Sequence, residues 1–426
     1  MPSDLKNGTL WTPPTFTDDG SQEGNASYLS AGGTHGMNGI LGEIAAVQSY
    51  AANRGHGIAN VRDFGATGDG TTDDRAAIQS AIDSGHRIIY LPPGMYRIND
   101  TLTLGTGGGN GKQLVGVNTG GINGGEFSCL VWGGVNHRGT AGKAMLDVDY
   151  GFCGGVHGIG FKNDGKTYYH MHVYNSQAEN WVEDSHHSRL LFWGDSHACV
   201  RFTKCHHQVL SDSFCDNGSS DGYFLEAENA NGCRVINCTT FFRRGAAFRF
   251  FGDAVSDHAD NSIQDCWVWL SGGCAHPIMI DELGTTPAVL LENQRAFRIT
   301  SNTFAANGGG VWLDGCSGVE ICGNVFDFHQ LDTIVVKDSS GVNVTGNTFT
   351  SAEHGMDDYG HYTLKTSGTT SRVLFSGNVD NDAYSSGVLL QGGTTHSVVD
   401  NYVHDGVSKT VTNQGGVTNV VGRVVG

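Results

Sequence analysis

Two acidic residues in the second half of this 426-residue chain have the type and spacing that cleavage of a glycosidic bond requires. Glu292 and Asp314 each follow a short apolar run, in LLE and WLD, at the same place in two successive copies of a repeat. Two carboxylates about 5–5.5 Å apart can supply the acid and the nucleophile of a retaining glycosidase. We therefore expect Glu292 and Asp314 to be catalytic, and Glu226, in an earlier copy, is a third catalytic candidate.

Candidates for substrate binding accompany this pair. The indole of Trp312 offers a flat apolar face on which a sugar ring can stack. Arg249 and Lys337 supply cations for polar or acidic sugars. Asp281 and Glu282 fall in a longer insertion, which we expect to overhang the same face of the molecule.

Two other interpretations of these residues stay open. Elimination at a uronic acid needs a cation for the sugar carboxylate and a base for the C5 proton. The residues available for it are Arg249, Lys337 and Lys365 as cations and Tyr362 or His361 as the base. Alternatively, the charged residues form an exposed ladder without catalytic function, and Glu226 is a solvated turn residue.

The elements that position these side chains are repeats of about 23 residues. Each copy contains short alternating or β-branched runs separated by Gly, Asn or Asp, and the clearest copies end in Asn-x-Phe. Three short strands per repeat predict an all-β parallel β-helix. We expect the bend asparagines to stack as a ladder and to adopt the left-handed backbone region. The expected ladder is Asn302, Asn324, Asn347, Asn378 and Asn401, with Asp212, Asn237 and Asp265 in the same place upstream.

Alignment on these bend residues assigns an outward-facing column of side chains to one sheet. Equivalent positions of adjacent coils lie about 4.8 Å apart, so Glu292 and Asp314 come within about 5 Å of each other and Glu226 lies about 10 Å from Glu292. The residues just before them are apolar and face inward. The expected column is Glu226, Phe251, Glu292, Asp314, Lys337, Lys365 and Gln391.

The most specific segment comprises residues 58–104. It contains FGATGDGTTDD, a short helical stretch that ends near Gly85, and strands on either side of the turn at Pro92 and Pro93. This segment resembles the opening of the pectate-lyase-like superfamily of right-handed parallel β-helices, which includes phage tailspikes and polysaccharide-degrading enzymes. The resemblance implies an N-terminal cap followed by the first coil, and a homotrimer of side-by-side β-helices. Lyases, hydrolases, epimerases and non-catalytic fibres share the motif, and the pectate lyase and polygalacturonase site motifs are absent.

These observations divide the chain into two parts. Residues 1–57 are predicted to form an extended arm and a helix, which either caps the coil or builds a three-chain neck. Apolar residues recur at helical spacing within residues 37–53. Residues 58–426 are predicted to form the right-handed parallel β-helix.

Composition and net charge limit the classes of molecule that the chain is expected to bind. A net charge of −18 argues against nucleic acid and anionic membranes, and no stretch reaches the about 20 apolar residues of a membrane span. The chain begins without a signal pattern, and its 11 cysteines lack paired spacing, so we expect buried free thiols with Cys238 and Cys266 stacked. We expect no metal and no cofactor, because the neighbouring histidines lack further ligands at metal-binding spacing. They are His170 and His172, His186 and His187, and His206 and His207.

Together these features favour a phage-tailspike-like protein that binds a bacterial surface polysaccharide and depolymerises it by glycosidic bond cleavage. We expect a homotrimer in the virion tail, made in the host cytoplasm and in contact with other virion tail proteins, or else secretion by a route not visible in the sequence. The alternatives are a free-standing polysaccharide lyase, hydrolase or epimerase, and a non-catalytic virion or surface fibre.

Overall fold

The structure is a computed structural model. It describes residues 57–105, 111–118, 127–137, 140–149, 153–163, 166–174, 184–216, 222–241, 245–253, 258–269, 286–350, 361–382, 385–391, 393–400, 402–404, 409–414 and 419–425. The expected arm and helix before residue 57 lie outside the described residues, as do Asp281, Glu282 and Asn401. The chain divides into two units, Met1–Ile58 with Gly85–Ile88 and Ala59–Ser84 with Ile89–Gly426, and the second contains nearly all described residues.

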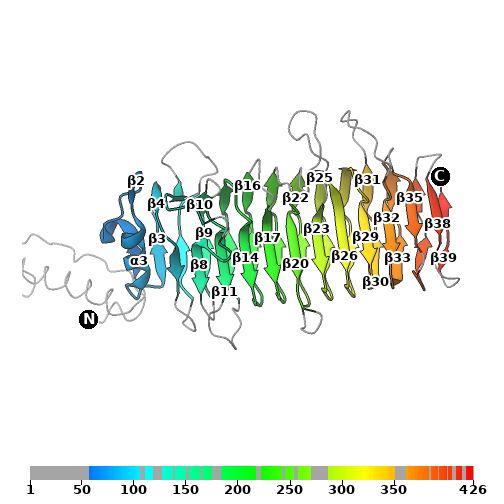
Figure 1. Cartoon of the computed structure of the whole chain (residues 1–426), viewed down its shortest axis with the longest axis horizontal. Coiled ribbons are helices and arrows are strands. Elements are labelled where there is room, and N and C mark those ends of the chain that lie inside the picture. The colour runs from blue at the N-terminus through cyan, green and yellow to red at the C-terminus, as the bar shows by residue number, and fades with distance from the viewer. Residues whose placement is uncertain are drawn as a thin grey trace, which may run out of the picture. The chain divides into compact units, whose positions relative to one another are not determined.

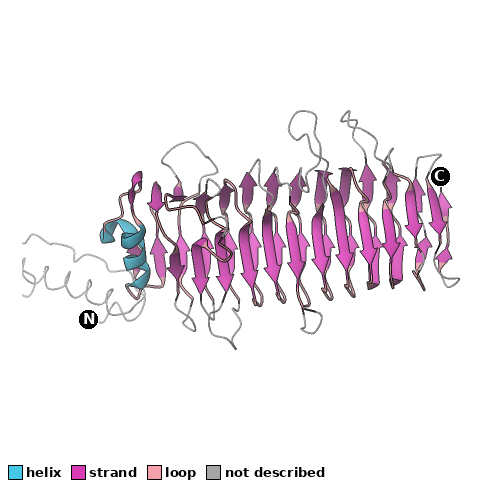
Figure 2. Ribbon diagram, in the orientation of Figure 1, coloured by secondary structure: helices cyan, strands magenta, loops and turns pink. Residues whose placement is uncertain are grey.

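The described strands form three sheets, of 14, 14 and 12 strands, which we name A, B and C (Figures 1 and 2). Sheet A contains β1 (Ile58–Asn60), β3 (Ile88–Tyr90), β6 (Gln113–Val115), β9 (Gly155–His157), β12 (His186–Ser188), β15 (Val209–Ser211), β18 (Arg234–Ile236), β21 (Ser262–Gln264), β24 (Arg298–Thr300), β27 (Glu320–Cys322), β30 (Ser340–Thr345), β33 (Ser371–Ser376), β36 (Val398–Asp400) and β39 (Val420–Val421). Sheet B contains β2 (Asp69–Asp73), β4 (Gly94–Ile98), β7 (Ser128–Trp132), β10 (Ile159–Lys162), β13 (Leu191–Trp193), β16 (Phe214–Asp216), β19 (Thr239–Phe241), β22 (Trp267–Trp269), β25 (Thr303–Asn307), β28 (Val325–His329), β31 (Thr348–Thr350), β34 (Val379–Asn381), β37 (Tyr402–His404) and β40 (Val424–Val425). Sheet C contains β5 (Leu102–Leu104), β8 (Ala144–Asp149), β11 (Tyr169–Tyr174), β14 (Ala198–Thr203), β17 (Tyr223–Glu228), β20 (Phe248–Phe251), β23 (Pro287–Glu292), β26 (Gly309–Asp314), β29 (Ile334–Lys337), β32 (Leu364–Ser367), β35 (Gly387–Leu390) and β38 (Thr410–Asn413).

Each full coil gives one strand to each sheet, and the coils stack in chain order, as the colours in Figure 1 show. Strands β24, β25 and β26 are one such coil. Neighbouring strands pair in parallel, so each residue lies beside its equivalent in the next coil, as Phe304 does beside Phe326. The predicted parallel β-helix with three short strands per coil is therefore confirmed.

Two short helices lie near the first coils. A 3-10 helix, η2, spans Val61–Phe64, and the α-helix α3 spans Arg75–Asp83. Ile78, Ala81 and Ile82 form the buried face of α3. The buried carboxylate of Asp74, at the N-cap of α3, accepts hydrogen bonds from the backbone N–H groups of residues 67 and 68, which fixes the preceding turn.

The core is built by inward-facing side chains that stack from coil to coil. Phe304, Phe326 and Phe349 are buried on sheet B, and their rings stack with centroids 5.2 and 5.1 Å apart. Such a column buries large apolar surfaces in every coil, which stabilises the stack. The inward residues therefore fix the register, and the outward residues are free for function.

The predicted asparagine ladder is confirmed and runs through four residues. Nδ2 of Asn302 donates to Oδ1 of Asn324 at 3.0 Å, and the same contact links Asn324 to Asn347 and Asn347 to Asn378. Each of these side chains is buried, so the ladder satisfies amide groups that water does not reach.

Two details of the ladder differ from the prediction. The left-handed residue is the one before each ladder position, as at Ser301 with φ 59° and Gly323 with φ 65°, and not the asparagine itself. Upstream, the ladder position belongs to Cys238 and Cys266 rather than to Asn237 and Asp265. Thr239, Trp267 and Thr303 are paired in adjacent coils, so the residues just before them, Cys238, Cys266 and Asn302, are equivalent. The described cysteines form no disulfide, and the backbone N–H of Cys238 donates to the sulfur of Cys266.

Candidate active site

The outward side chains of sheet C form two parallel columns, and one contains the expected catalytic pair. Glu292 pairs with Asp314 and Asp314 with Lys337, so these three residues stack in consecutive coils as predicted. Phe251 precedes them, beside Glu292. We call this set the Glu292 column; it consists of Asp149, Tyr174, Thr203, Glu228, Phe251, Glu292, Asp314, Lys337 and Ser367.

The expected places of Glu226 and Lys365 in this column are wrong by two residues. Phe251 pairs with Glu228, and Lys337 pairs with Ser367. The error at Glu226 arose because Asn237 was taken as the bend residue, whereas Cys238 holds that position. Since side chains alternate along a strand, a two-residue shift leaves Glu226 and Lys365 on the outer face but moves them to a neighbouring column.

Glu226 and Lys365 belong to the second column, which we call the Glu226 column. It brings titratable residues from five consecutive coils into one line. Its members are Asp147, His172, Arg201, Glu226, Arg249, Leu290, Trp312, Val335 and Lys365. Arg201, Glu226 and Arg249 alternate in charge at close to the repeat length, and this signal in the sequence was missed.

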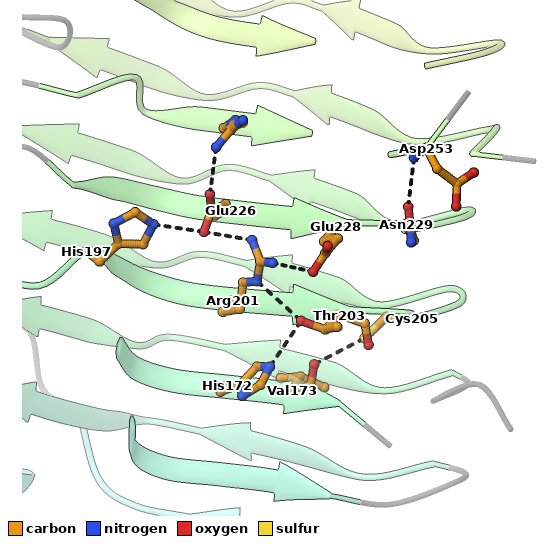
Figure 3. Close-up of polar contacts among 11 residues, drawn as sticks. His172, Val173, His197, Arg201, Thr203, Cys205, Glu226, Glu228, Asn229 and Asp253 are labelled. Atoms are coloured by element: carbon orange, nitrogen blue, oxygen red, sulfur yellow. Dashed lines mark hydrogen bonds and ion pairs between the residues drawn. The ribbon is translucent and has the colours of Figure 1, made fainter. Parts of the chain in front are cut away.

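Glu226 is at the centre of the polar contacts within the Glu226 column, as Figure 3 shows. Its side chain in β17 is only 3% exposed, so it is not a solvated turn residue. Arg201 Nη1 lies 2.7 Å from its carboxylate and Arg249 Nη1 lies 3.1 Å from it. His197 Nε2 contacts the same carboxylate at 3.1 Å. Sequence reasoning had not selected His197, which lies in the turn before β14.

The two arginines also tie the centre to the Glu292 column. Arg201 Nη2 bonds to Glu228, and Arg249 Nε bonds to Glu292 Oε2 at 2.8 Å. The carboxylates and guanidinium groups thus alternate across four coils. Because charge-assisted hydrogen bonds of this kind are strong and directional, they hold the side chains in fixed positions.

The surroundings of Glu226 determine its charge. Burial raises the pKa of Glu226, but the hydrogen bond from His197 and the charges of Arg201, His197 and Arg249 outweigh it, and the pKa lies below its ordinary value. Glu226 is therefore ionised at neutral pH and accepts hydrogen bonds only. Consequently His197 Nε2 donates the proton of this hydrogen bond, and Nδ1 has no hydrogen-bond partner among the described residues.

Aromatic side chains surround this centre. His197 stacks on Tyr168 with ring centroids 4.4 Å apart and meets Tyr223 edge-on at 5.5 Å. The Arg249 guanidinium lies 4.2 Å from the centroid of the Phe251 ring. Burial raises the pKa of Tyr223, so its hydroxyl stays protonated. Aromatic faces beside hydrogen-bonding groups are the chemistry that recognises sugar rings.

The N-terminal end of the Glu226 column contains two side chains, Asp147 and His172, whose pKa values are shifted from their ordinary values. Burial raises the pKa of Asp147 to about 7, and Asp149 adds to that rise although Lys143 opposes it. Burial, with the charge of Arg201, lowers the pKa of His172 to about 3. His172 Nδ1 lies 3.9 Å from Asp147 Oδ1, and at neutral pH His172 is uncharged whereas Asp147 is about half ionised.

The remaining candidates lie farther from the centre. Lys337 Nζ lies 2.8 Å from Asp314 Oδ2, and both side chains are about half exposed. Each carboxylate of the expected pair thus has its own cation, Arg249 for Glu292 and Lys337 for Asp314. His361, the expected base of an elimination, is buried and bonds to Asp382 at 2.9 Å, which places it in the core instead.

Within the described residues, no group of three or more His, Cys, Asp or Glu side chains is placed to hold a metal ion. None of the described helices has the length and apolar character that crossing a lipid bilayer requires. The buried His170 contacts the carbonyl oxygen of Trp193, and His187 contacts Gln208.

Comparisons with known proteins agree with this architecture. A family model described as the right handed beta helix region matches residues 190–370 and 284–423, which together cover more than half of the chain. A second model, described as rhamnogalacturonase A/epimerase, pectate lyase-like, matches residues 58–119. The resemblance inferred from the opening motif and the repeats is therefore confirmed.

Individual relatives match in part. Mannuronan C5-epimerase AlgE6 of Azotobacter vinelandii is 59% identical over 44 residues, which are 9% of this chain and 5% of that protein. The A-module of that epimerase superposes with a TM-score of 0.68 at 19% identity over 86% of this chain and 98% of that chain. Tailspike protein 3 of bacteriophage CBA120 superposes with a TM-score of 0.51 at 15% identity. This superposition covers 85% of this chain and 61% of the tailspike chain. At these identities the two superpositions show a shared fold.

Proposed function

Because this chain belongs to the right-handed β-helix family, we propose that it binds a uronate-containing polysaccharide along sheet C and cleaves it by β-elimination. The reactive centre is His197, Glu226 and Arg249. The observation that carries the proposal is the buried, ionised carboxylate of Glu226, which orients His197 on one side and Arg249 on the other.

In the proposed reaction Arg249 binds the sugar carboxylate. Its Nε and Nη1 bond to Glu292 and Glu226, and its side chain also interacts with Tyr223. A guanidinium has five N–H donors, so further N–H groups of Arg249 can bind the substrate. Neutralising the sugar carboxylate makes the C5 proton more acidic. His197 Nδ1 takes this proton, with Glu226 stabilising the imidazolium as in other carboxylate–histidine pairs.

The bond changes then balance without an external oxidant or reductant. The electron pair of the C5–H bond forms the C4–C5 double bond, and the C4–O glycosidic bond breaks. The departing oxygen takes a proton from the protonated hydroxyl of Tyr223 or from water. Return of a proton to the opposite face of C5, before the C4–O bond breaks, gives epimerisation from the same residues.

The relatives suggest where the search for a substrate begins. The epimerase relatives are named for mannuronan, which is a uronate polymer. Arg249, which is partly exposed, suits such an anionic polymer. Polymannuronate is accordingly the first polysaccharide to test.

Hydrolysis is the second candidate, and the adjacent register of Glu292 and Asp314 favours it. A retaining hydrolase would use them as acid and nucleophile. One of the two must then carry a proton, whereas each has a cation of its own in this structure. For that reason we place hydrolysis second.

The repeats and the opening motif of the sequence also suggest a biological setting for this activity. We propose that the chain acts in a phage tail as a side-by-side homotrimer, in contact with a bacterial surface polysaccharide. The fold likeness to a phage tailspike is compatible with this setting.

The test is incubation with polymannuronate, polyguluronate, polygalacturonate and a neutral glucan. Ultraviolet absorbance reports unsaturated uronates, a reducing-end assay reports all cleavage, and proton NMR reports epimerised units. We expect unsaturated ends from one polyuronate, and a loss of about 10²- to 10⁴-fold in His197→Ala. His186→Ala, on sheet A, is the matched control and should retain the parent rate. Reducing ends without unsaturated products would favour the Glu292 and Asp314 route instead.

A further inference from the structure

Trp312 lies on the outer face of sheet C, in the Glu226 column, two coils beyond Arg249. Its neighbours on the same strand, Val311 and Leu313, are buried in the core, so the indole itself is not a core side chain. The indole Nε1 donates to the backbone oxygen of Asp332 at 2.9 Å. That bond fixes the rotation of the ring.

A glycine makes room for this ring position. A Cβ atom at Gly309 would lie 2.9 Å from Trp312 Nε1 and 3.1 Å from Cε2, which is tighter than side chains tolerate. The indole therefore lies along its own strand, over the place where a side chain at residue 309 would project. The Trp312 side chain is partly exposed, so the ring keeps accessible surface on which a sugar can stack.

Asp332 connects this ring to a cation farther along the same column. Its Oδ1 accepts the backbone N–H of Tyr362 at 2.9 Å, and its Oδ2 accepts Lys365 Nζ at 2.8 Å. Lys365 follows Trp312 by two coils, through Val335. The aromatic face and the partly exposed ammonium are thus held in one line by a single residue.

We propose that Gly309, Trp312 and Asp332 form a distal sugar-binding subsite, and that Lys365 binds the carboxylate of a uronate beyond it. The proposal rests on the proposed function and gives the direction of the polymer: it lies along the coil axis over sheet C. Two coil spacings separate Arg249 from Trp312, and two more separate Trp312 from Lys365, about 10 Å each. A polymer must therefore be several sugars long to reach from the reactive centre to Lys365.

This arrangement predicts a preference for long chains. Short oligosaccharides that fill the reactive centre do not reach the indole, so they gain nothing from it. One aromatic contact contributes about 0.5–1.5 kcal/mol, which corresponds to roughly a threefold to tenfold change in affinity. The gain appears in Kd and KM, whereas kcat stays the same because Trp312 does not touch the reacting sugar.

The test measures binding of short and long oligomannuronates by calorimetry, and cleavage of both, in the parent and in Trp312→Ala. We expect the variant to lose roughly threefold to tenfold in affinity for long chains only. Gly309→Ala should show the same loss while the indole is still present, because the added methyl group displaces it. Lys365→Met should weaken binding of polymannuronate and not of a neutral oligosaccharide. The matched control is Trp267→Ala, which removes an exposed indole from sheet B.

The outcomes separate the subsite from the reaction. If the parent binds and cleaves a polyuronate and Trp312→Ala matches it at every chain length, the subsite is refuted and the reactive centre stands. Equal losses for short and long chains would show that Trp312 supports the fold or the centre instead. A parent that neither binds nor cleaves polymannuronate, polyguluronate or polygalacturonate refutes the proposed function and the subsite together.

Discussion

Replacing Lys409 by methionine should destabilise the last coils strongly, because it breaks a buried ion pair. Asp380 lies in β34 beside Phe349, at an inward position where the two preceding coils have phenylalanine. Its side chain is fully buried, and Lys409 Nζ lies 3.1 Å from Oδ1 and 2.7 Å from the Asp380 backbone oxygen. Tyr402 Oη donates to the same carboxylate at 2.5 Å.

The magnitude follows from what remains after the change. Removing one partner of a buried ion pair typically costs about 3–5 kcal/mol, because the other charge stays buried. Asp380 would still accept hydrogen bonds from the hydroxyl groups of Tyr402, Thr363 and Ser385 and from the backbone N–H of Asp382. We therefore expect the lower end of that range, about 3 kcal/mol.

The assay is urea unfolding followed by circular dichroism, with the midpoint compared at unchanged slope. Lys337→Met is the matched control, since Lys337 bonds to Asp314 at 2.8 Å but both side chains are about half exposed. Its midpoint should stay at the parent value. Equal midpoints for Lys409→Met and the parent would refute the reasoning that burial makes this pair strong.

Three further predictions follow from the ladder, the buried histidines and the family resemblance. Asn324→Ala should cost about 1–3 kcal/mol, because it leaves the buried N–H of Asn302 without an acceptor, whereas the exposed Asn343→Ala should unfold like the parent. Burial, with the charge of His361, lowers the pKa of His329 to about 3, so its contribution to stability is present above pH 6.5 and is lost as the pH falls toward 3. His329→Leu should therefore lose less stability than the parent between pH 6.5 and 4, and parallel pH-dependent melts would contradict this. Light scattering at micromolar concentration should show a trimer, and a stable monomer would remove the tailspike analogy for assembly.

The fold could be predicted from the sequence because its signal is repeated. The ungapped copies around Asn302, Asn324 and Asn347 fix both the inward phenylalanine column and the asparagine ladder. The adjacency of Glu292 and Asp314 followed from the same copies. Repetition makes such predictions robust, since an error in one copy is exposed by its neighbours.

The site was harder to predict, because its residues depart from the repeat. At Cys238 a thiol replaces the ladder amide, which shifted the assumed register and moved Glu226 into the wrong column. His197 lies in a turn, where no periodicity marks it, and only the folded coil brings it to Glu226. The Gly309 contact with Trp312 depends on a side-chain rotamer, which a sequence pattern does not specify.

The central claim is that His197, held by Glu226, removes the C5 proton of a uronate bound at Arg249. The most direct measurement is proton NMR of polymannuronate during incubation, following the C5 hydrogen in the parent and in His197→Ala. The parent should lose the C5 signal as the glycosidic bonds break, and His197→Ala should retain it although the polymer still binds. Cleavage that leaves every C5 hydrogen in place, or loss of that hydrogen at the parent rate in His197→Ala, would contradict the account.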